Sequence, residues 1–417
     1  MKKRVWSIVL IAATILAVFG VGASAAKTKI DVMFWWDIDN PSLVEMKKQF
    51  NAKYPDIEVN YINVPSKEFY DKLLTMIVGG KAPDVAMLGM DKLATFASKG
   101  ALTDLTKYME TQYPVTDLFD TVKPSLMYKG KYYALPRDVT TNVLYYNKKI
   151  FREHGVAYPK AGWTWDDFLA AAKKTTHFGP DGKAEHFGFN YESYADSFIH
   201  WMWQNGGDFL NADYTKSALS NKESVEALQF LVDLRLKYHV CPTIPEAQSL
   251  GREEDLFRTG RLAMYIGGVS RTQKFAAQAD LDWDVVPNPV GKKGPASRIW
   301  TNLWIVPRGT KNLDAAWKFV SFVGGPEGQR IAAKTNMGIP ALKSIASEPD
   351  FLSQAPDHRQ YFLDAFKYGK VFPIFPEGQE YWDIVVKREL EPVWLGQRSP
   401  AEAAAAIDKI ANDTLFK

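Results

Sequence analysis

Residues 131–151, KYYALPRDVTTNVLYYNKKIF, contain two apolar runs separated by polar residues. The runs, at 132–135 and 143–146, are rich in aromatic and β-branched side chains, which favour extended chain. Pro136 lacks an N–H group and biases the residue before it toward an extended geometry. A long extended segment with polar residues at its middle suits a strand that leaves one domain and enters another. We therefore expect Asp138 to lie at a junction between two domains, beside a cleft.

The same segment resembles the hinge of family 1 extracellular solute-binding proteins, the sugar-capturing partners of bacterial ABC importers. The resemblance rests on residues 133–138 (Y-A-L-P-R-D) and 144–148 (L-Y-Y-N-K), and it covers nearly all of the chain after residue 25. It implies an α/β fold of the type II periplasmic binding protein class, with two discontinuous lobes joined by hinge strands. The first lobe is expected to comprise residues 26–137 and about 288–340. The second is expected to comprise residues about 138–287 and 341–417.

The pattern of the residues themselves also predicts an α/β protein. Apolar runs at 30–36, 57–64 and 84–88 read as strands, and periodic apolar faces between them read as helices. Asn40 and Thr164 are expected helix caps. Further along the chain, the pattern predicts strands at 260–266, 283–286 and 303–306, and helices at about 196–204, 222–237, 313–323, 356–368, 378–395 and 399–415. Alternating strands and helices favour a mainly parallel sheet.

Residues 1–25 have the features of a cleaved Sec signal peptide. Lys2, Lys3 and Arg4 precede a mostly apolar run at 5–20, and residues 23–25 (A-S-A) offer a cleavage site. The alternative is an uncleaved membrane anchor, but the run is shorter than the roughly 18–20 residues that a span needs. Cys241 is the single cysteine, so no cysteine follows the signal to carry a lipid and no intrachain disulfide can form. We expect a free periplasmic protein.

The charge of the chain argues against nucleic acid as a partner. The formal net charge is +3, and the first 25 residues carry three cations and no acids, so the remainder is neutral. A neutral chain lacks the basic surface that nucleic-acid binding requires.

The candidate ligand-binding residues were sought at the ends of predicted strands, where open α/β sheets bind their ligands. A sugar offers an apolar C–H face to an aromatic ring and hydroxyls to carboxylates or amides. The candidates are Trp35, Trp36, Asp37, Asp91, Asp138, Trp201, Trp203, Gly267, Gly268, Trp300, Asn302 and Trp382.

Each candidate of the first lobe has a structural alternative. One of Trp35 and Trp36 could pack in the core, and Asp37 could belong to a turn. Asp91 could cap a helix, although P-D-V-A-M-L-G-M-D at 83–91 resembles the family segment in which an aspartate binds a sugar hydroxyl. Asp138 could be a buried carboxylate that steadies the crossover.

Structural alternatives also exist for the tryptophan candidates outside the first strand. Trp201 and Trp203 are two residues apart, so they face different sides of a helix, and core packing is the alternative for each. Gly267 and Gly268 would let the backbone approach a ligand closely. The segment around Trp300 and Asn302 resembles the family's cleft edge. Trp382 matches a stacking tryptophan of maltose-binding members in its local context, with helix packing as the alternative.

No catalytic or cofactor motif stands out. The sequence contains no H-E-x-x-H, no G-x-S-x-G and no Walker loop, and its six histidines show no metal-ligand spacing. We expect no cofactor, no metal and no catalysis. The resemblance implies a monomeric protein that delivers a mono- or oligosaccharide to an inner-membrane ABC permease. Two alternatives remain: the same fold binding a peptide, polyamine or other solute, and an exported glycoside hydrolase.

Overall fold

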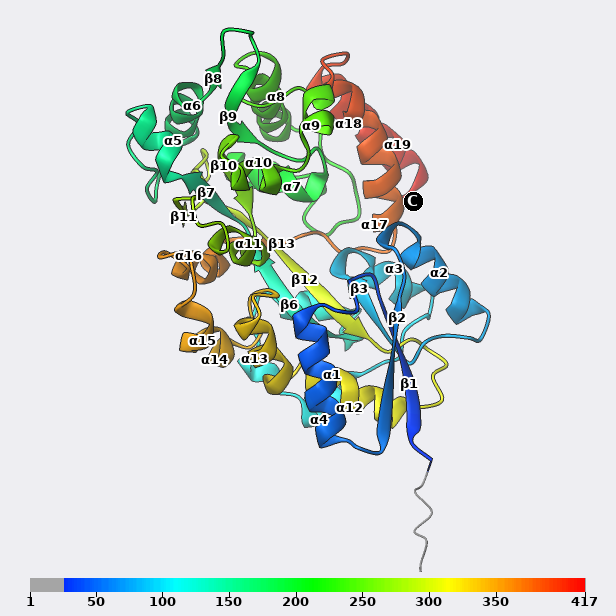
Figure 1. Cartoon of the computed structure of the whole chain (residues 1–417). Helices are drawn as coiled ribbons and strands as arrows, with labels where there is room; N and C mark the ends of the chain where they lie inside the picture. Colours follow the sequence, from blue (N-terminus) through cyan, green and yellow to red (C-terminus); the bar gives the residue numbers. More distant parts are fainter. Residues whose placement is uncertain (1–25, 417) are drawn as a thin grey trace, which may run out of the picture.

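Two β-sheets, joined by continuous chain, organise residues 26–416, which are the residues that the computed structural model describes (Figure 1). The expected signal peptide at 1–25 lies outside them. Each sheet carries its own helices and forms one lobe, the first below and the second above in Figure 1. Within residues 26–416 no helix is long and apolar enough to cross a bilayer.

The first sheet has the strand order β13-β12-β3-β1-β2, with β6 also paired to β12. β1 runs parallel to β2 and β3, whereas β12 is antiparallel to β3 and β6. The strands are β1 (Thr28–Phe34), β2 (Ile57–Asn63), β3 (Val85–Gly89), β6 (Ala134–Thr141), β12 (Ser297–Ile305) and β13 (Gly369–Val371). The helices of this lobe include α1 (Pro41–Lys53), α2 (Ser66–Val78), α3 (Leu93–Ser98), α4 (Thr106–Gln112), α12 (Leu313–Val323), α13 (Pro326–Lys334), α14 (Lys343–Ala346), α15 (Pro349–Leu352) and α16 (Gln360–Asp364).

The second sheet has the order β11-β7-β10-β9-β8. Its strands are β7 (Val143–Asn147), β8 (His177–Phe178), β9 (Ala184–Asn190), β10 (Leu262–Gly267) and β11 (Trp283–Val286). The helices around it are α5 (Lys148–Glu153), α6 (Trp165–Lys174), α7 (Ala195–Asn205), α8 (Lys222–Leu236), α9 (Ile244–Leu250), α10 (Glu253–Arg258) and α11 (Thr272–Ala276). The C-terminal run adds α17 (Gly378–Glu380), a π-helical turn (Tyr381–Val386), α18 (Lys387–Trp394) and α19 (Pro400–Thr414).

The expected helix caps act as local chemistry predicts. The Asn40 side chain accepts from the N–H of Ser42 at the start of α1. Thr164 and Asp167 form a reciprocal capping box at the start of α6, which satisfies two N–H groups that the first turn leaves unpaired.

The crossing between the lobes is short and tightly bonded. β6 ends at Thr141 and β7 begins at Val143, so Asn142 alone separates the two sheets. The N–H of Asn142 donates to the Ser297 hydroxyl (2.9 Å), which donates back to the Asn142 carbonyl (2.8 Å). Because Ser297 begins β12, the outgoing and returning chains are tied together at the hinge.

The boundaries of the lobes differ from those expected. The first lobe was expected to end at residue 137, but β6 stays paired with β12 as far as Thr141. Residues 341–371 were expected in the second lobe, yet α14 and α15 pack on α13, and β13 pairs with β12. The strand expected at 303–306 begins at Ser297, so Trp300 and Asn302 lie within it rather than before it. The helix expected at 356–368 is reduced to α16 and a 3₁₀ turn.

Candidate ligand-binding site

β12 presents alternate side chains to one face of the first sheet. Arg298, Trp300 and Asn302 are partly exposed, whereas the residues between them are buried. Successive strand side chains point to opposite faces, so these three share one face. On the neighbouring β6, Thr140 lies opposite Trp300 and Asp138 lies opposite Asn302. Of these residues, Thr140, Arg298 and Trp300 form the floor of a cavity between the lobes, whereas Asp138 and Asn302 do not line it.

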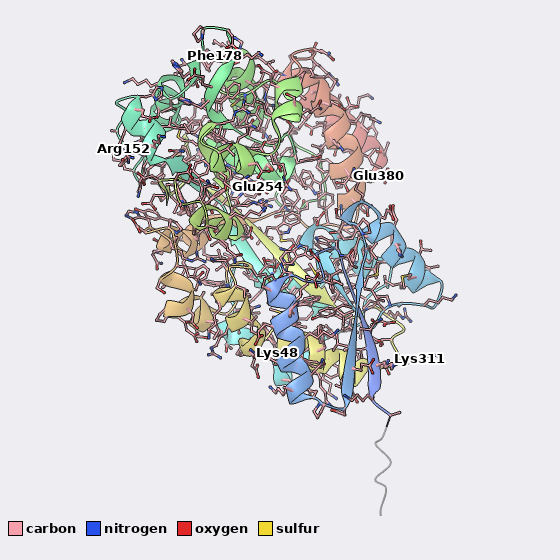
Figure 2. All side chains as sticks on the ribbon, in the orientation of Figure 1. Lys48, Arg152, Phe178, Glu254, Lys311 and Glu380 are labelled. Atoms are coloured by element: carbon pink, nitrogen blue, oxygen red, sulfur yellow. The ribbon has the colours of Figure 1, made fainter. Side chains whose placement is uncertain are left out.

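A cavity of about 280 Å³ lies against this floor, with walls from both lobes. Thr140, Asn142, Arg298 and Trp300 line it from the crossing strands. From the second lobe it is lined mainly by residues that follow the carboxyl ends of β9 and β10, where α/β folds place their ligands. These include Glu192, Asp196, Gly267, Gly268, Ser270 and Arg271, together with Arg252, Glu253 and Glu254 at the start of α10. Figure 2 shows Glu254 on the part of the upper lobe that faces the lower lobe.

Gly268 lets the chain approach the crossing strand closely at the end of β10, and Gly267 leaves room for the Tyr265 ring of the same strand. A Cβ atom on Gly268 would lie 2.2 Å from Cγ2 of Thr140, and one on Gly267 would lie 2.6 Å from the Tyr265 ring. Neither distance is compatible with a side chain in place. The Tyr145 hydroxyl also donates to the Gly268 carbonyl at 2.8 Å, which holds this backbone in position.

The charged residues of the cavity largely neutralise one another. Asp196 accepts from Arg298 at 3.0 Å, and this pair joins α7 to β12. Glu254 pairs with Arg271 and, at 3.4 Å, with Lys274. The site therefore offers donors and acceptors for hydrogen bonds with little net charge of its own.

Glu253 is the exception to this neutralisation. Burial, with a further contribution from the negative charge of Glu192, raises the pKa of Glu253 to about 7. Its carboxyl accepts from the Asn190 amide at 3.0 Å, and Arg252 is 3.7 Å from Glu192 rather than paired with Glu253 itself. Glu253 therefore holds a proton over part of the neutral pH range and can then donate a hydrogen bond.

Asp91 lies beside Trp300 at the end of β3. A Cβ on Gly89 would meet Oδ1 of Asp91 at 2.5 Å, the Tyr70 hydroxyl at 3.0 Å and the Trp300 ring at 3.4 Å, so these three groups converge there. Lys92 lies 3.0 Å from Asp91 and 2.8 Å from Asp383 on the π-helical turn. Burial raises the pKa of Asp91, and the ammonium group of Lys92 opposes that shift.

An aromatic row continues from Trp300 behind the cavity. Its ring centroid is 5.6 Å from that of Phe372, which is 4.6 Å from that of Trp382, which in turn contacts Phe209. Trp382 is only 7% exposed. Trp382 therefore packs against Phe372 inside the protein, and Trp300 is the member of the row that lines the cavity.

A second cavity of about 660 Å³ adjoins the first in the upper lobe. Tyr191, Glu192, Arg252 and Glu253 line both. The second extends between α9 and α18, where its further lining includes the exposed Tyr194 ring, Arg235, Lys387, Glu391 and Trp394. Together the two adjoining cavities have room for a ligand that is longer than one small sugar ring.

The first-lobe candidates fall into two groups. Trp35 packs edge-on against Phe69 and Tyr70, and Trp36 lies under the guanidinium of Arg137 at 3.6 Å from its ring centroid. Asp37 is exposed and accepts from the N–H of Asp39, as in a turn. None of these three lines the cavity, and neither does Asp91, although Asp91 converges on Trp300.

The remaining candidates are also divided. Asp138 is 2% exposed and is bonded to Arg137 (2.6 Å) and to the Asn302 amide (3.2 Å), below the cavity floor. Trp201 is fully buried in the core, and Trp203 is 5% exposed with its indole N–H donating to Asp208. Gly267, Gly268 and Trp300 line the cavity. Ligand contact by any of these residues stays a prediction.

The charged residues of the second lobe were not among the candidates. Arg298 carried a usable signal, because it continues the alternation of Trp300 and Asn302 along one strand. Asp196, Glu253 and Arg271 carried none, since acids are common in the first turn of a helix and cations in the last turn on any surface.

Comparison with known proteins identifies the fold and the family. The family model described as bacterial extracellular solute-binding protein matches residues 45–360. An ABC substrate-binding protein from Listeria monocytogenes, solved in complex with cycloalternan, is 30% identical, with a TM-score of 0.85 over 94% of this chain and 100% of that one. The predicted two-lobed type II fold and the predicted resemblance are thus confirmed.

Proteins that resemble this chain in sequence also match nearly all of its length. A binding protein of Brucella abortus (strain 2308) is 27% identical over 98% of this chain and 99% of its own length. The arabinooligosaccharide-binding protein of Bacillus subtilis (strain 168) is 24% identical over 100% of this chain and 94% of its own.

Proposed function

Because this chain belongs to the family of bacterial extracellular solute-binding proteins, we propose that it captures a carbohydrate, and specifically an oligosaccharide, between its lobes for delivery to an ABC importer. The observation that carries the proposal is the cavity between the lobes, where an aromatic ring, glycine backbone and neutralised charged groups meet. The Listeria protein and the Bacillus protein named above are described as carbohydrate binders, which supports this ligand class.

The chemistry of the cavity matches an uncharged polyol. The Trp300 face can cover the C–H side of a sugar ring, and the carboxylate of Asp196 can accept from its hydroxyls. Asp91 lies beside Trp300 outside the cavity lining, and we propose that it contacts a longer ligand. Arg271 and Ser270 can donate to hydroxyl or ring oxygens from the opposite wall. Since acids and arginines occur together, the cavity favours neither a polycation nor a polyanion.

The two-lobed construction supplies the mechanism of capture. A sugar that contacts β12 and the loops after β9 and β10 interacts with both lobes at once. Such a ligand stabilises the closed arrangement by its greater affinity for it. The hinge is the crossing at Asn142 and the return at Ser297, where few residues need to change their backbone angles.

The family is one of binding proteins, and the protein is proposed to catalyse nothing. The inner-membrane permease of an ABC importer is the proposed partner of the closed form, with the binding protein acting as a monomer. The family is extracellular by description, in agreement with export. Cleavage after residue 25 and a free periplasmic location remain part of the proposal.

Isothermal titration of the exported protein with neutral saccharides tests the function. Cycloalternan, arabino-oligosaccharides and malto-oligosaccharides should be compared with their monosaccharides, and at least one oligosaccharide is expected to bind with a one-to-one stoichiometry. The same series should raise the melting temperature, since a ligand that binds only the folded state stabilises it. Absence of binding by every saccharide would overturn the proposal.

Two further arms separate the alternatives. Binding of spermidine or of a short peptide, but of no sugar, would assign the cavity to another solute. Shortening of an oligosaccharide on prolonged incubation, followed by chromatography, would establish a hydrolase instead.

A further inference from the structure

The second cavity, between α9 and α18, is more than twice as large as the cavity on the floor between the lobes. Their volumes are about 660 Å³ and about 280 Å³. Pockets that bind small molecules usually measure about 300–1,000 Å³, so the first cavity alone lies at the lower limit of that range. In Figure 1 α9 and α18 lie beside one another in the upper lobe. Most of the space open to a ligand therefore lies between these two helices.

The two cavities meet at four residues that line both. Tyr191 and Glu192 follow the end of β9, and Arg252 and Glu253 stand at the start of α10. Since the same side chains border both spaces, a chain-like ligand that leaves the first cavity past them enters the second.

The second cavity has an open aromatic ring on its wall. The Tyr194 side chain lines it and is 55% exposed, and the ammonium group of Lys387 lies 5.7 Å from the centroid of its ring. Trp394 also lines the cavity but is only 4% exposed, and its ring packs edge-on against that of Tyr191 at 5.9 Å. An uncovered aromatic face gains free energy when the C–H face of a sugar covers it. Tyr194 is therefore the residue of this cavity that is suited to stacking.

The polar groups of the second cavity are of mixed charge, like those of the first. Lys387 and Glu391 are one turn apart on α18 and both line it. Arg252 lies 3.7 Å from Glu192 at the boundary of the two cavities. Hydrogen-bond donors and acceptors are thus present without an excess of either sign, which favours an uncharged ligand with many hydroxyls.

α9 forms an outer wall that has few contacts of its own. Its first turn is fixed by a capping box of Thr243 and Glu246, but none of its residues is buried. Ile244, Pro245 and Ala247 line the cavity from this helix. These apolar side chains are therefore available for contact with a ligand.

We propose that the second cavity binds the further units of the same oligosaccharide whose first units occupy the cavity between the lobes, with Tyr194 as its stacking surface. This inference rests on the proposed function and deepens it, because it predicts selection of the ligand by length. Longer chains bind more tightly than the disaccharide, since only they reach Tyr194.

Isothermal titration with sugars of increasing length tests the inference, using maltose to maltohexaose or the matching series of whichever sugar binds. The affinity of the wild type is expected to rise by about tenfold or more along the series, at one ligand per chain. Tyr194→Ala should weaken hexasaccharide binding by about tenfold and leave disaccharide binding unchanged. The matched control is Tyr158→Ala, which removes an exposed tyrosine of the same lobe that lines neither cavity. It should bind every length like the wild type.

A second variant fills the cavity instead of removing its stacking surface. Ala247→Trp places a large side chain on the α9 wall, and it should also weaken binding of the hexasaccharide but not of the disaccharide. Equal affinity of the wild type for all lengths, two ligands per chain, or variants that leave hexasaccharide binding unchanged or weaken both lengths equally would overturn the inference. In each of these outcomes the disaccharide still binds the wild type, so the proposed function stands. Failure of every sugar to bind would count against the function itself.

Discussion

Trp300 brings together an aromatic face and polar neighbours at the ligand cavity. Its ring lies 5.2 Å from the guanidinium carbon of Arg298, and its indole N–H donates to the Asn302 side chain at 3.3 Å. The ring is thus held by contacts along its own strand while one face remains toward the cavity. A side chain fixed in this way loses little conformational entropy when a ligand stacks on it.

Replacement of Trp300 by alanine is expected to weaken oligosaccharide binding by about tenfold to a hundredfold, because the stacking surface is lost. Trp300→Phe should recover part of the affinity by restoring an aromatic face. The matched control is Trp317→Phe, since Trp317 is buried on α12 and bonded to Gln112, away from the cavity lining. Isothermal titration gives the affinities, and unchanged affinity in Trp300→Ala would exclude a stacking role.

The raised pKa of Glu253 predicts a pH-dependent stability. An acid whose pKa is higher in the folded state than in the unfolded state retains its proton longer when folded, so the free energy of unfolding falls as pH rises from about 4.5 to 7. Glu253→Gln keeps the oxygen that accepts from Asn190 and removes the ionisation.

The stability of the variant relative to the wild type should therefore rise between pH 5 and about 7 and level off above that, by up to about 3 kcal/mol, since each pKa unit corresponds to about 1.4 kcal/mol. Melting temperatures across that range measure the difference, with the exposed Glu110→Gln as a control. Parallel pH profiles for the wild type and Glu253→Gln would contradict the assignment.

Residues on strands were easier to predict from the sequence than residues on helices, for a physical reason. Asp91 follows the end of β3, and Trp300 alternates with buried residues along β12, so strand periodicity indicates which of these side chains leave the core. Trp201 and Trp203 lie on a helix buried on nearly every side, so neither the spacing nor the residue type could show that both are enclosed. The direction of a helix toward the cleft depends on tertiary packing, which local sequence does not encode.

At the scale of elements, the residue that follows β10 approaches β6 very closely. Gly268 faces Thr140 so closely that any side chain would overlap the threonine methyl group. This contact lies at the junction of the lobes, so its geometry determines how the second-lobe loops meet the floor of the cavity.

Gly268→Ala should destabilise the protein by about 1–3 kcal/mol, since the added methyl group forces the strands apart. Thr140→Ser removes the methyl group that the new Cβ would strike, and the double variant should regain most of the loss. Chemical denaturation of the two single variants and the double variant gives the coupling energy. Additive effects in that cycle would show that the two positions do not meet as described.

Helices were predicted correctly where the capping residues and the apolar periodicity indicated the same bounds. The expected helix at 313–323 matches α12, and the cap at Thr164 is the observed one. β12 was expected only from residue 303, because its first half alternates polar and apolar residues and contains Arg298 and Asn302. That alternation is the normal pattern of a strand with one face toward solvent, and it marks the half of the strand that faces the cleft.

For the whole molecule, the sequence indicates two lobes but not their borders. The crossing after Asp138 was anticipated from the polar middle of one extended segment, yet the sheet continues to Thr141. The expectation that residues 341–371 belong to the second lobe was wrong, because a short amphipathic helix carries no sign of which sheet it covers. The resemblance to a family supplied the two-lobed arrangement that periodicity alone leaves open.

The ion pair of Asp196 and Arg298 joins α7 of the second lobe to β12 of the first, so it should favour the arrangement in which the lobes are close. Asp196→Asn removes the negative partner and leaves the largely buried Arg298 without it, and we expect the unliganded protein to open. Small-angle X-ray scattering without ligand should then give a larger radius of gyration than for the wild type. Asp314→Asn is the matched control, because Asp314 also stands in the first turn of a helix but pairs with no Lys or Arg within residues 26–416. Since the scattering is measured without sugar, any direct contact of Asp196 with the ligand does not enter. An unchanged radius in Asp196→Asn would mean that the pair does not govern closure, and the hinge at Asn142 would then set the resting angle alone.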